Sequence, residues 1–184
     1  MPHSVTLYTT MESPIGQLIL TGDRSHITGL LLPEDHGRRT SVDPLWIRAD
    51  DAFGEAVAQL DAYFAGQLTR FALPIALSGT PFQMRVWRAL QQIRYGETAT
   101  YGQIAAQIGQ PAAVRAVGLA NGRNPIAIIV PCHRVVGAGG ALTGYGGGLD
   151  RKRWLLDLEQ RVVAAERSVA TSATMEPALA GAGV

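Results

Sequence analysis

The stretch that decides the fold is Ile126-Ala127-Ile128-Ile129-Val130-Pro131-Cys132-His133-Arg134-Val135-Val136. Its first five residues are apolar and mostly β-branched, a pattern typical of a strand buried on both faces. Pro131 interrupts that strand, because proline has no backbone N–H to donate to a sheet. Cys132 and His133 follow, and neighbouring side chains in a strand point to opposite faces. The two side chains can therefore cooperate only if the chain turns after Pro131.

Composition indicates a globular protein without metal or membrane segments. The chain has 184 residues and an apolar fraction of 47%, enough for a substantial core. No signal peptide is recognised at the N-terminus, and no apolar run approaches the ~20 residues of a membrane span. A single cysteine excludes a disulfide framework within the chain, and the four histidines share no metal-ligand spacing. We expect a cytoplasmic protein that needs no cofactor.

Charge is distributed unevenly along the chain. Residues 1–79 contain five Arg against nine Asp or Glu, whereas residues 80–167 contain eleven Lys or Arg against five Asp or Glu. A basic half that includes the cysteine favours a polyanionic partner. Uneven scatter of surface charge explains the counts equally well, so charge alone does not decide.

The N-terminal half is expected to form a small antiparallel sheet and one helix, ending near residue 79. Residues 4–32 alternate apolar and polar side chains around turn signals, which is typical of β-hairpins. Residues 33–50 resemble a loop, and residues 53–64 resemble a helix with one apolar face. The apolar positions of that helix are Phe53, Val57, Leu60 and Phe64.

A mainly helical domain is expected over residues 80–163. Thr80 followed by Pro81 predicts the start of a helix. Two shorter helices, 101–108 and 112–120, are joined by a glycine turn, as in a helix-turn-helix. The second of them lacks the several Arg, Asn or Gln side chains that read bases in the major groove. Its small residues suit close approach to a narrow groove, and they suit packing against a core as well.

The C-terminal part combines a glycine-rich loop, a helix and a tail. Seven of the twelve residues in 137–148 are glycine, without a phosphate-loop fingerprint, so a loop lining a planar ligand fits better. A closing helix follows, with Glu159 beside its apolar stripe, where a carboxylate needs a partner or an edge position. Residues 164–184 are rich in Ala, Ser and Gly, and a disordered tail is predicted there.

Cys132 has two interpretations. A lone cysteine after a buried strand is usually an inert buried thiol. The adjacent His133, nearby Arg134 and the glycine-rich loop favour a nucleophile, because a thiolate needs a base or a cation to offset burial. His133 could take the thiol proton directly or through a water while Glu159 orients the imidazole, which would make a Cys-His-Glu relay.

Five motifs, in this order, resemble the O6-alkylguanine-DNA alkyltransferases (methylated-DNA–protein-cysteine methyltransferases). They include the family's PCHRV signature, and the resemblance spans about residues 80–160. The matching segments are Tyr95–Tyr101 before the helix-turn-helix, Ala113–Gly118 in the recognition helix, Asn124-Pro125 ahead of the active-site strand, Pro131–Val136 as the signature, and Tyr145–Leu149 as the guanine-binding loop.

The resemblance implies an α+β fold, with a ribonuclease H-like domain over residues 1–79 and an alkyltransferase domain over 80–163. It implies a DNA repair protein that transfers the alkyl group of O6-alkylguanine, and of O4-alkylthymine, irreversibly to Cys132, once per molecule. The damaged base must swing out of the duplex because its O6 substituent is inaccessible in the stack. The implied partner is double-stranded DNA, bound through the minor groove with little sequence preference by a monomer.

The resemblance also implies roles for single residues. Cys132 would attack the alkyl carbon, His133 would remove its proton through a water, and Glu159 would support His133. Tyr101 would contact the 3′ phosphate and the extruded base, and Asn124 would fix the turn before the active-site strand. The implied DNA contacts are Tyr101, Ala113, Arg115, Ala116, Asn121 and Arg123, with Arg115 filling the vacated stack. The implied base pocket consists of Arg134, Val135, Tyr145 and Gly146.

Two departures and two rivals accompany this resemblance. Position 146 is Gly where some relatives have Ser, so only a backbone hydrogen-bond donor is implied there. The N-terminal half has no set of metal ligands like the one that binds zinc in some relatives. A thiol hydrolase with the same three residues would turn over repeatedly on an acyl substrate. A non-catalytic DNA-binding relative of the alkyltransferase-like type would lack the cysteine that this chain has.

Overall fold

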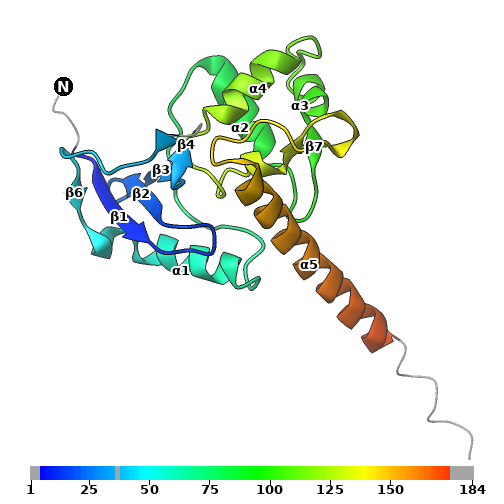
Figure 1. Ribbon diagram of the computed structural model, residues 1–184, viewed down its shortest axis with the longest axis horizontal. Coiled ribbons are helices and arrows are strands. Elements are labelled where there is room, and N and C mark those ends of the chain that lie inside the picture. Colours follow the sequence, from blue (N-terminus) through cyan, green and yellow to red (C-terminus); the bar gives the residue numbers. More distant parts are fainter. Residues whose placement is uncertain (1–4, 36–37, 175–184) are drawn as a thin grey trace, which may run out of the picture.

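The N-terminal half is built on a four-stranded sheet with the strand order β3-β2-β1-β6. The computed structural model describes residues 5–35 and 38–174 (Figure 1). Strands β1 to β3 pair antiparallel, as the hairpin pattern predicted, but β6 pairs with β1 in parallel, so the sheet is mixed. The strands are β1 (Leu7–Met11), β2 (Leu18–Gly22), β3 (Ile27–Leu31) and β6 (Ile47–Arg48), with β4 (Glu34–Asp35) and β5 (Arg38–Arg39) in a separate ribbon.

One helix packs against this sheet. The short 3-10 helix η1 (Asp50–Phe53) leads into α1 (Gly54–Phe64), within the predicted span. Its buried face differs from the predicted one, because Val57 and Phe64 are only partly buried. The buried residues of η1 and α1 are Phe53, Ala56, Leu60 and Tyr63.

The outer edge of the sheet is closed by backbone hydrogen bonds from both halves of the chain. Ile27 N donates to Pro74 O at 2.8 Å within the N-terminal half, and Leu30 N donates to Pro125 O of the C-terminal half at 2.9 Å. Ala127 N in turn donates to Leu30 O at 3.2 Å. The N-terminal sheet therefore anchors the segment that leads to Cys132, and its edge groups are satisfied.

The predicted helix-turn-helix is present. Helix α2 (Pro81–Leu90) begins at Thr80 with a capping box, in which Gln83 N donates to Thr80 Oγ1 and Thr80 N donates to Gln83 Oε1. Trp87 Nε1 donates to Ala120 O at 2.9 Å and holds α2 against α4. The two helices of the motif are α3 (Tyr101–Gln107) and α4 (Val114–Gly122).

Residues 126–136 are buried as predicted, apart from the partly buried Ile129, but the prediction of a strand is wrong. Ile128 has a φ of +68°, and Val130 N donates to Ile126 O at 3.0 Å, so the chain turns here. Pro131 is followed by the 3-10 turn η2 (Cys132–Arg134), and only β8 (Val135–Val136) is extended, parallel to β7 (Ala99–Thr100). A buried turn and a buried strand demand the same apolar residues, so burial alone did not separate them.

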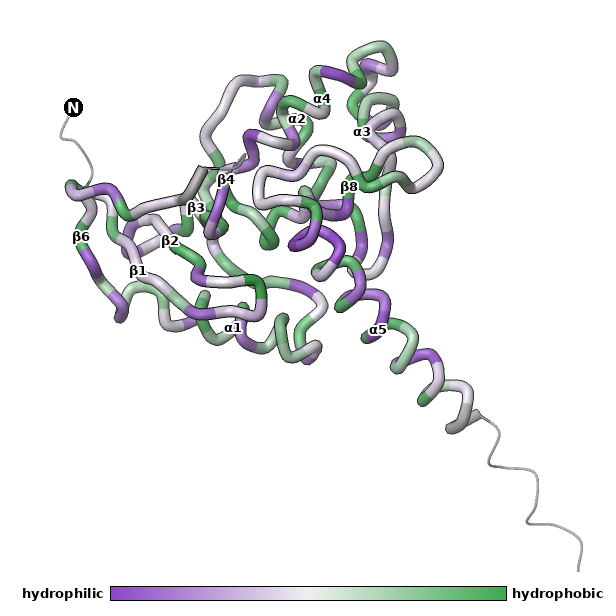
Figure 2. The backbone as a smooth tube through the Cα atoms, viewed as in Figure 1, coloured by the Kyte–Doolittle hydropathy of each residue, from purple (hydrophilic) through white to green (hydrophobic). Residues whose placement is uncertain are grey.

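The last helix is longer than the sequence predicted. Helix α5 (Leu149–Thr174) includes residues 164–174, where disorder was predicted, and its end projects from the body (Figure 1). Alanines are strong helix formers, and Val163 anchors the helix because Gly96, with a φ of +74°, leaves room for it. Hydrophilic residues recur along the projecting part (Figure 2). The remaining predicted tail, 175–184, lies outside the described residues.

A short 3-10 helix, η3 (Ala138–Gly140), interrupts the glycine-rich loop between β8 and α5. Gly139, Gly140, Gly144 and Gly148 have positive φ values between 48° and 86°, which explains the glycine content of this loop. Within residues 5–35 and 38–174, no helix has the length and apolar character needed to cross a membrane.

Candidate active site

His133 and Glu159 form a buried pair next to Cys132. His133 Nε2 lies 2.9 Å from Glu159 Oε1, and both side chains are completely buried. Burial lowers the pKa of His133, so its imidazole is neutral near pH 7. With the Nε2 proton directed at the carboxylate, Nδ1 has a free lone pair, and it has no hydrogen-bond partner among the described residues. The ring is thus set up to accept a proton at Nδ1.

The Glu159 carboxylate accepts hydrogen bonds from residues in several parts of the chain. Arg134 Nη2 lies 2.9 Å from Oε1, and Arg134 Nε lies 3.0 Å from Oε2. Gly96 N donates to Oε2 at 3.0 Å, and Tyr63 Oη donates to Oε1 at 2.8 Å. Burial opposes ionisation, but hydrogen bonds and charge from His133 and Arg134 lower the pKa of Glu159 to about 2. The carboxylate is therefore ionised throughout the physiological pH range.

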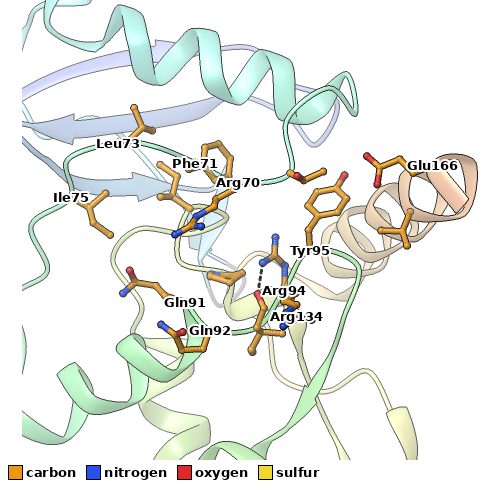
Figure 3. Close-up of a pocket in the computed structure, with 15 residues that line it drawn as sticks. Arg70, Phe71, Leu73, Ile75, Gln91, Gln92, Arg94, Tyr95, Arg134 and Glu166 are labelled. Atoms are coloured by element: carbon orange, nitrogen blue, oxygen red, sulfur yellow. Dashed lines mark hydrogen bonds between the residues drawn. The ribbon is translucent and has the colours of Figure 1, made fainter. Parts of the chain in front are cut away.

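Arg134 lies away from the predicted base pocket. Its Nη1 donates to Ile93 O at 2.7 Å, and its guanidinium lies 5.6 Å from the centroid of the Tyr95 ring. With Pro131 and Tyr95 it lines a cavity of about 640 Å³. Figure 3 shows the Arg134 and Tyr95 side chains in this cavity. Arg134 is thus directed at Glu159 and Ile93, and its contact with the substrate base stays a prediction.

Cys132 lines a second cavity, of about 430 Å³, which includes Asn124, Tyr145 and Gly146. The thiol is only 6% exposed. Burial raises the pKa of Cys132, while a hydrogen bond with the Asn124 side chain and the charge of Lys152 oppose that shift. The resting residue is therefore a thiol, and its use as a nucleophile requires a base.

Two asparagines hold the turn that presents Cys132. Asn124 Nδ2 donates to Val130 O at 2.7 Å, and Ile126 N donates to Asn124 Oδ1 at 3.1 Å. Asn121 is 2% exposed, and its Nδ2 lies 3.4 Å from Cys132 O. Asn121 follows Val117 by four residues, shares the buried face of α4 and lines the Cys132 cavity, and its contact with DNA stays a prediction.

Side-chain hydrogen bonds from Tyr101 and Lys152 hold the glycine-rich loop in place. Tyr101 Oη donates to Thr143 O at 3.1 Å and to Gly144 O at 3.2 Å. Lys152 Nζ donates to Val135 O at 2.6 Å and to Thr143 O at 2.8 Å, and burial lowers the pKa of this lysine to about 8. Val135 is buried in β8 and is not among the residues that line the cavity, and its place in the base pocket stays a prediction.

The outer surface of α4 presents several of the predicted DNA contacts. Arg115, Ala116 and Arg123 are exposed and Ala113 is half-buried, so all four side chains are accessible. Arg123 also belongs to the rim of the Cys132 cavity. Their contacts with DNA stay predictions.

Sequence reasoning missed two side chains of the site, Tyr63 and Lys152. Tyr63 is completely buried and follows Phe53 and Leu60 at helical spacing. This spacing could have identified it, but the predicted apolar face of the helix did not include Tyr63. Lys152 is buried, whereas its neighbours in the sequence, Arg151 and Arg153, are less buried. It precedes Glu159 by seven residues, so Lys152 and Glu159 lie on the same helix face.

These features are typical of a class of enzymes with a thiol nucleophile, an imidazole base and a supporting carboxylate, here built on a helix-turn-helix domain. A family model described as the DNA-binding domain of 6-O-methylguanine DNA methyltransferase matches residues 81–171. A second, described as the ribonuclease-like domain of the same protein, matches residues 6–77.

Named relatives agree with these matches. The chain is 59% identical over 154 residues to the methylated-DNA–protein-cysteine methyltransferase of Mycobacterium leprae, covering 84% of this chain and 92% of the relative. It is 53% identical over 152 residues to that of Methanosarcina acetivorans, covering 83% and 97%. A crystal structure of Mycobacterium tuberculosis OGT in complex with DNA is similar with a TM-score of 0.80 and 57% identity, covering 85% and 94%. The chain belongs to the 6-O-methylguanine DNA methyltransferase family.

Proposed function

We propose that this protein repairs DNA by transferring the alkyl group from guanine O6 to its own Cys132. The supporting observation is the position of the only cysteine on the wall of a cavity, with the neutral, buried His133–Glu159 pair behind it. A cavity of about 430 Å³ accommodates a single extruded base. The solved relative in complex with DNA supports double-stranded DNA as the partner.

The transfer is a single displacement at the alkyl carbon. His133 Nδ1 accepts the Cys132 proton through a water, and Glu159 stabilises the imidazolium that forms. The S–C bond then forms as the C–O6 bond breaks, and guanine leaves with the electron pair and acquires a proton. The Gly146 backbone N–H favours that departure by donating to the departing base. A thioether has no acid-base route back to the thiol, so each molecule acts once.

The DNA is placed along the outer face of α4. Arg115 fills the stack that the flipped base vacates, Arg123 contacts the backbone near the cavity, and Ala113 and Ala116 let the helix approach the minor groove closely. Tyr101 positions the 3′ phosphate of the flipped nucleotide. Asn124 keeps Cys132 at the cavity wall through its hydrogen bonds within the turn.

The wider expectations complete the proposal. The chain divides near residue 79 into a ribonuclease H-like part and an alkyltransferase part. The protein acts as a cytoplasmic monomer, needs no cofactor or metal, and accepts O4-alkylthymine as well as O6-alkylguanine.

The test is mass spectrometry of the intact protein after incubation with a duplex that contains O6-methylguanine. We expect one added methyl group on the wild-type chain, located on the peptide that contains Cys132, and none on Cys132→Ala. Cys132→Ala should bind the same duplex with unchanged affinity, because the thiol is buried and makes no backbone contact with DNA. Continuous turnover, or methyl uptake by the Cys132→Ala variant, would contradict the proposal and favour a thiol hydrolase or another acceptor.

A further inference from the structure

The catalytic carboxylate receives one of its hydrogen bonds from the opposite half of the molecule. Tyr63 lies in α1 of the N-terminal half, 96 positions before Glu159, and its hydroxyl donates to Glu159 Oε1 at 2.8 Å. The same hydroxyl lies 3.5 Å from His133 Nε2. Oε1 is therefore the atom where the phenol of Tyr63, the imidazole of His133 and the guanidinium of Arg134 converge.

This hydroxyl is a fixed donor in a closed environment. Tyr63 is completely buried, and its ring packs against Phe64, Phe71 and Tyr95 with centroid distances of 5.3 to 5.9 Å. Burial, together with the charge of Glu159, raises the pKa of Tyr63, so the phenol retains its proton at any physiological pH. Tyr63 lines neither the cavity beside Arg134 nor the cavity beside Cys132, so its hydroxyl faces the buried ionic network and not either of these two spaces.

We infer that Tyr63 is a positioning residue of the transfer reaction, through which the N-terminal half of the protein orients the Glu159 carboxylate toward His133. The inference rests on the proposed function and adds to it a role for the N-terminal half in the chemistry. With its phenol bond, Oε1 is held at the His133 ring and part of its negative charge is neutralised. Without it, Arg134 still contacts both carboxylate oxygens, and the undiminished charge on Oε1 holds the imidazolium more tightly.

The direction of the effect follows from the groups that face His133. These are Glu159 and Lys152 from α5, Arg134 and Cys132 from the η2 turn, and Tyr63 from α1. Glu159 stays ionised and Tyr63 stays neutral, and Lys152 titrates only near pH 8. Below pH 7, the loss of activity with falling pH therefore reports protonation of His133, which must be neutral to accept the thiol proton.

The experiment measures the single-turnover rate of methyl transfer from an O6-methylguanine duplex against pH, using the full chain. For Tyr63→Phe we expect a rate about tenfold lower at neutral pH. We also expect the acid limb, the part of the pH–rate profile where the rate falls with falling pH, to move to higher pH, because the protonated form of His133 is favoured. The matched control is Tyr95→Phe. Tyr95 belongs to the same aromatic cluster, but its hydroxyl has no hydrogen-bond partner among the described residues. We expect Tyr95→Phe to leave the acid limb in place.

Replacement of Tyr63 by 3-fluorotyrosine provides a second variant that retains the hydroxyl. It should restore the rate and return the acid limb to the wild-type position or below it, because a more acidic phenol is a stronger donor. An acid limb that does not move in Tyr63→Phe, or that moves equally in Tyr95→Phe, would overturn the inference and leave Tyr63 as a packing residue. Failure of the wild-type chain to take up methyl would instead contradict the proposed function.

Discussion

Cys132 and Arg134 are two positions apart, yet they face different compartments of the molecule. Cys132 lines the cavity beside α4 and the glycine-rich loop, whereas Arg134 lines the cavity on the opposite side, near the end of α5. His133 lies between them with no exposed surface. On the Cys132 side, Asn124 and Lys152 donate hydrogen bonds to backbone carbonyls, whereas the other side is held by an ionic network around Glu159. A 3-10 turn thus separates the atom that reacts from the charges that support its base.

The largest expected effect on stability comes from the ionic side. Glu159→Gln should lower the free energy of unfolding at pH 7 by about 3 kcal/mol, because the pKa of Glu159 falls from 4.5 to about 2 in the folded protein. A carboxyl whose pKa is lowered by folding stabilises the protein above its unfolded pKa. That contribution is lost as the pH falls from 4.5 to about 2.

Urea unfolding of the wild-type chain and of Glu159→Gln across this pH range measures the difference in their free energies of unfolding. This difference should become steadily smaller as the solution becomes more acidic. Glu166→Gln is the matched control, because Glu166 is an exposed carboxylate of the same helix. A difference between Glu159→Gln and the wild-type chain that does not change with pH would exclude ionisation of Glu159 as its cause.

On the substrate side, Asn124→Ala should lower the free energy of unfolding by about 2 kcal/mol, because Val130 O and Ile126 N lose their partner inside the turn. The rate of methyl transfer should fall with it, since the turn positions Cys132. Thermal unfolding and single-turnover kinetics measure the two effects. Asn124→Asp keeps the acceptor for Ile126 N but not the donor, so an intermediate loss is expected. A fully stable and active Asn124→Ala protein would refute the positioning role.

Arg115→Ala should slow repair of duplex DNA about tenfold, or ~1.4 kcal/mol in the barrier, because nothing fills the stack after base flipping. Transfer from free O6-benzylguanine should be unchanged, since a free base needs no extrusion. Arg167→Ala, which removes the same charge from the projecting end of α5, should affect neither substrate. Equal loss on both substrates in Arg115→Ala would indicate a damaged fold instead.

The smallest expected effect is that of the reaction product. A methyl group on Cys132 adds volume to a thiol that is only 6% exposed and lies against the α4 end of the cavity. Overpacking of this kind should lower the free energy of unfolding by about 1 kcal/mol. Calorimetry of the protein before and after methylation measures it, and an unchanged melting temperature would show that the cavity absorbs the methyl group.

The comparison also separates what the sequence could predict from what it could not. Local signals and matching motifs predicted the helix start at Thr80-Pro81, the helix-turn-helix and the pairing of His133 with Glu159. The structure places these elements and this pair as expected. The directions of Asn121, Arg134 and Val135 depended on how a turn and a helix are oriented against their neighbours. Residue spacing does not specify those orientations.

Two further differences have the same origin. Ile126–Val130 satisfied the pattern of a buried strand, but Ile126 forms only an isolated bridge with Leu30, and the residues after it turn. Residues 164–174 were judged by composition, although their alanines also favour a helix that Val163 anchors through long-range packing at Gly96. Tertiary contacts decided both segments.

The most direct test of the account is the stoichiometry of repair with a large excess of O6-methylguanine duplex. We expect a burst that stops when one methyl group has been removed per protein molecule, with the methyl group recovered as a thioether on Cys132. Removal of many methyl groups per molecule, or a burst that ends with Cys132 unmodified, would contradict it.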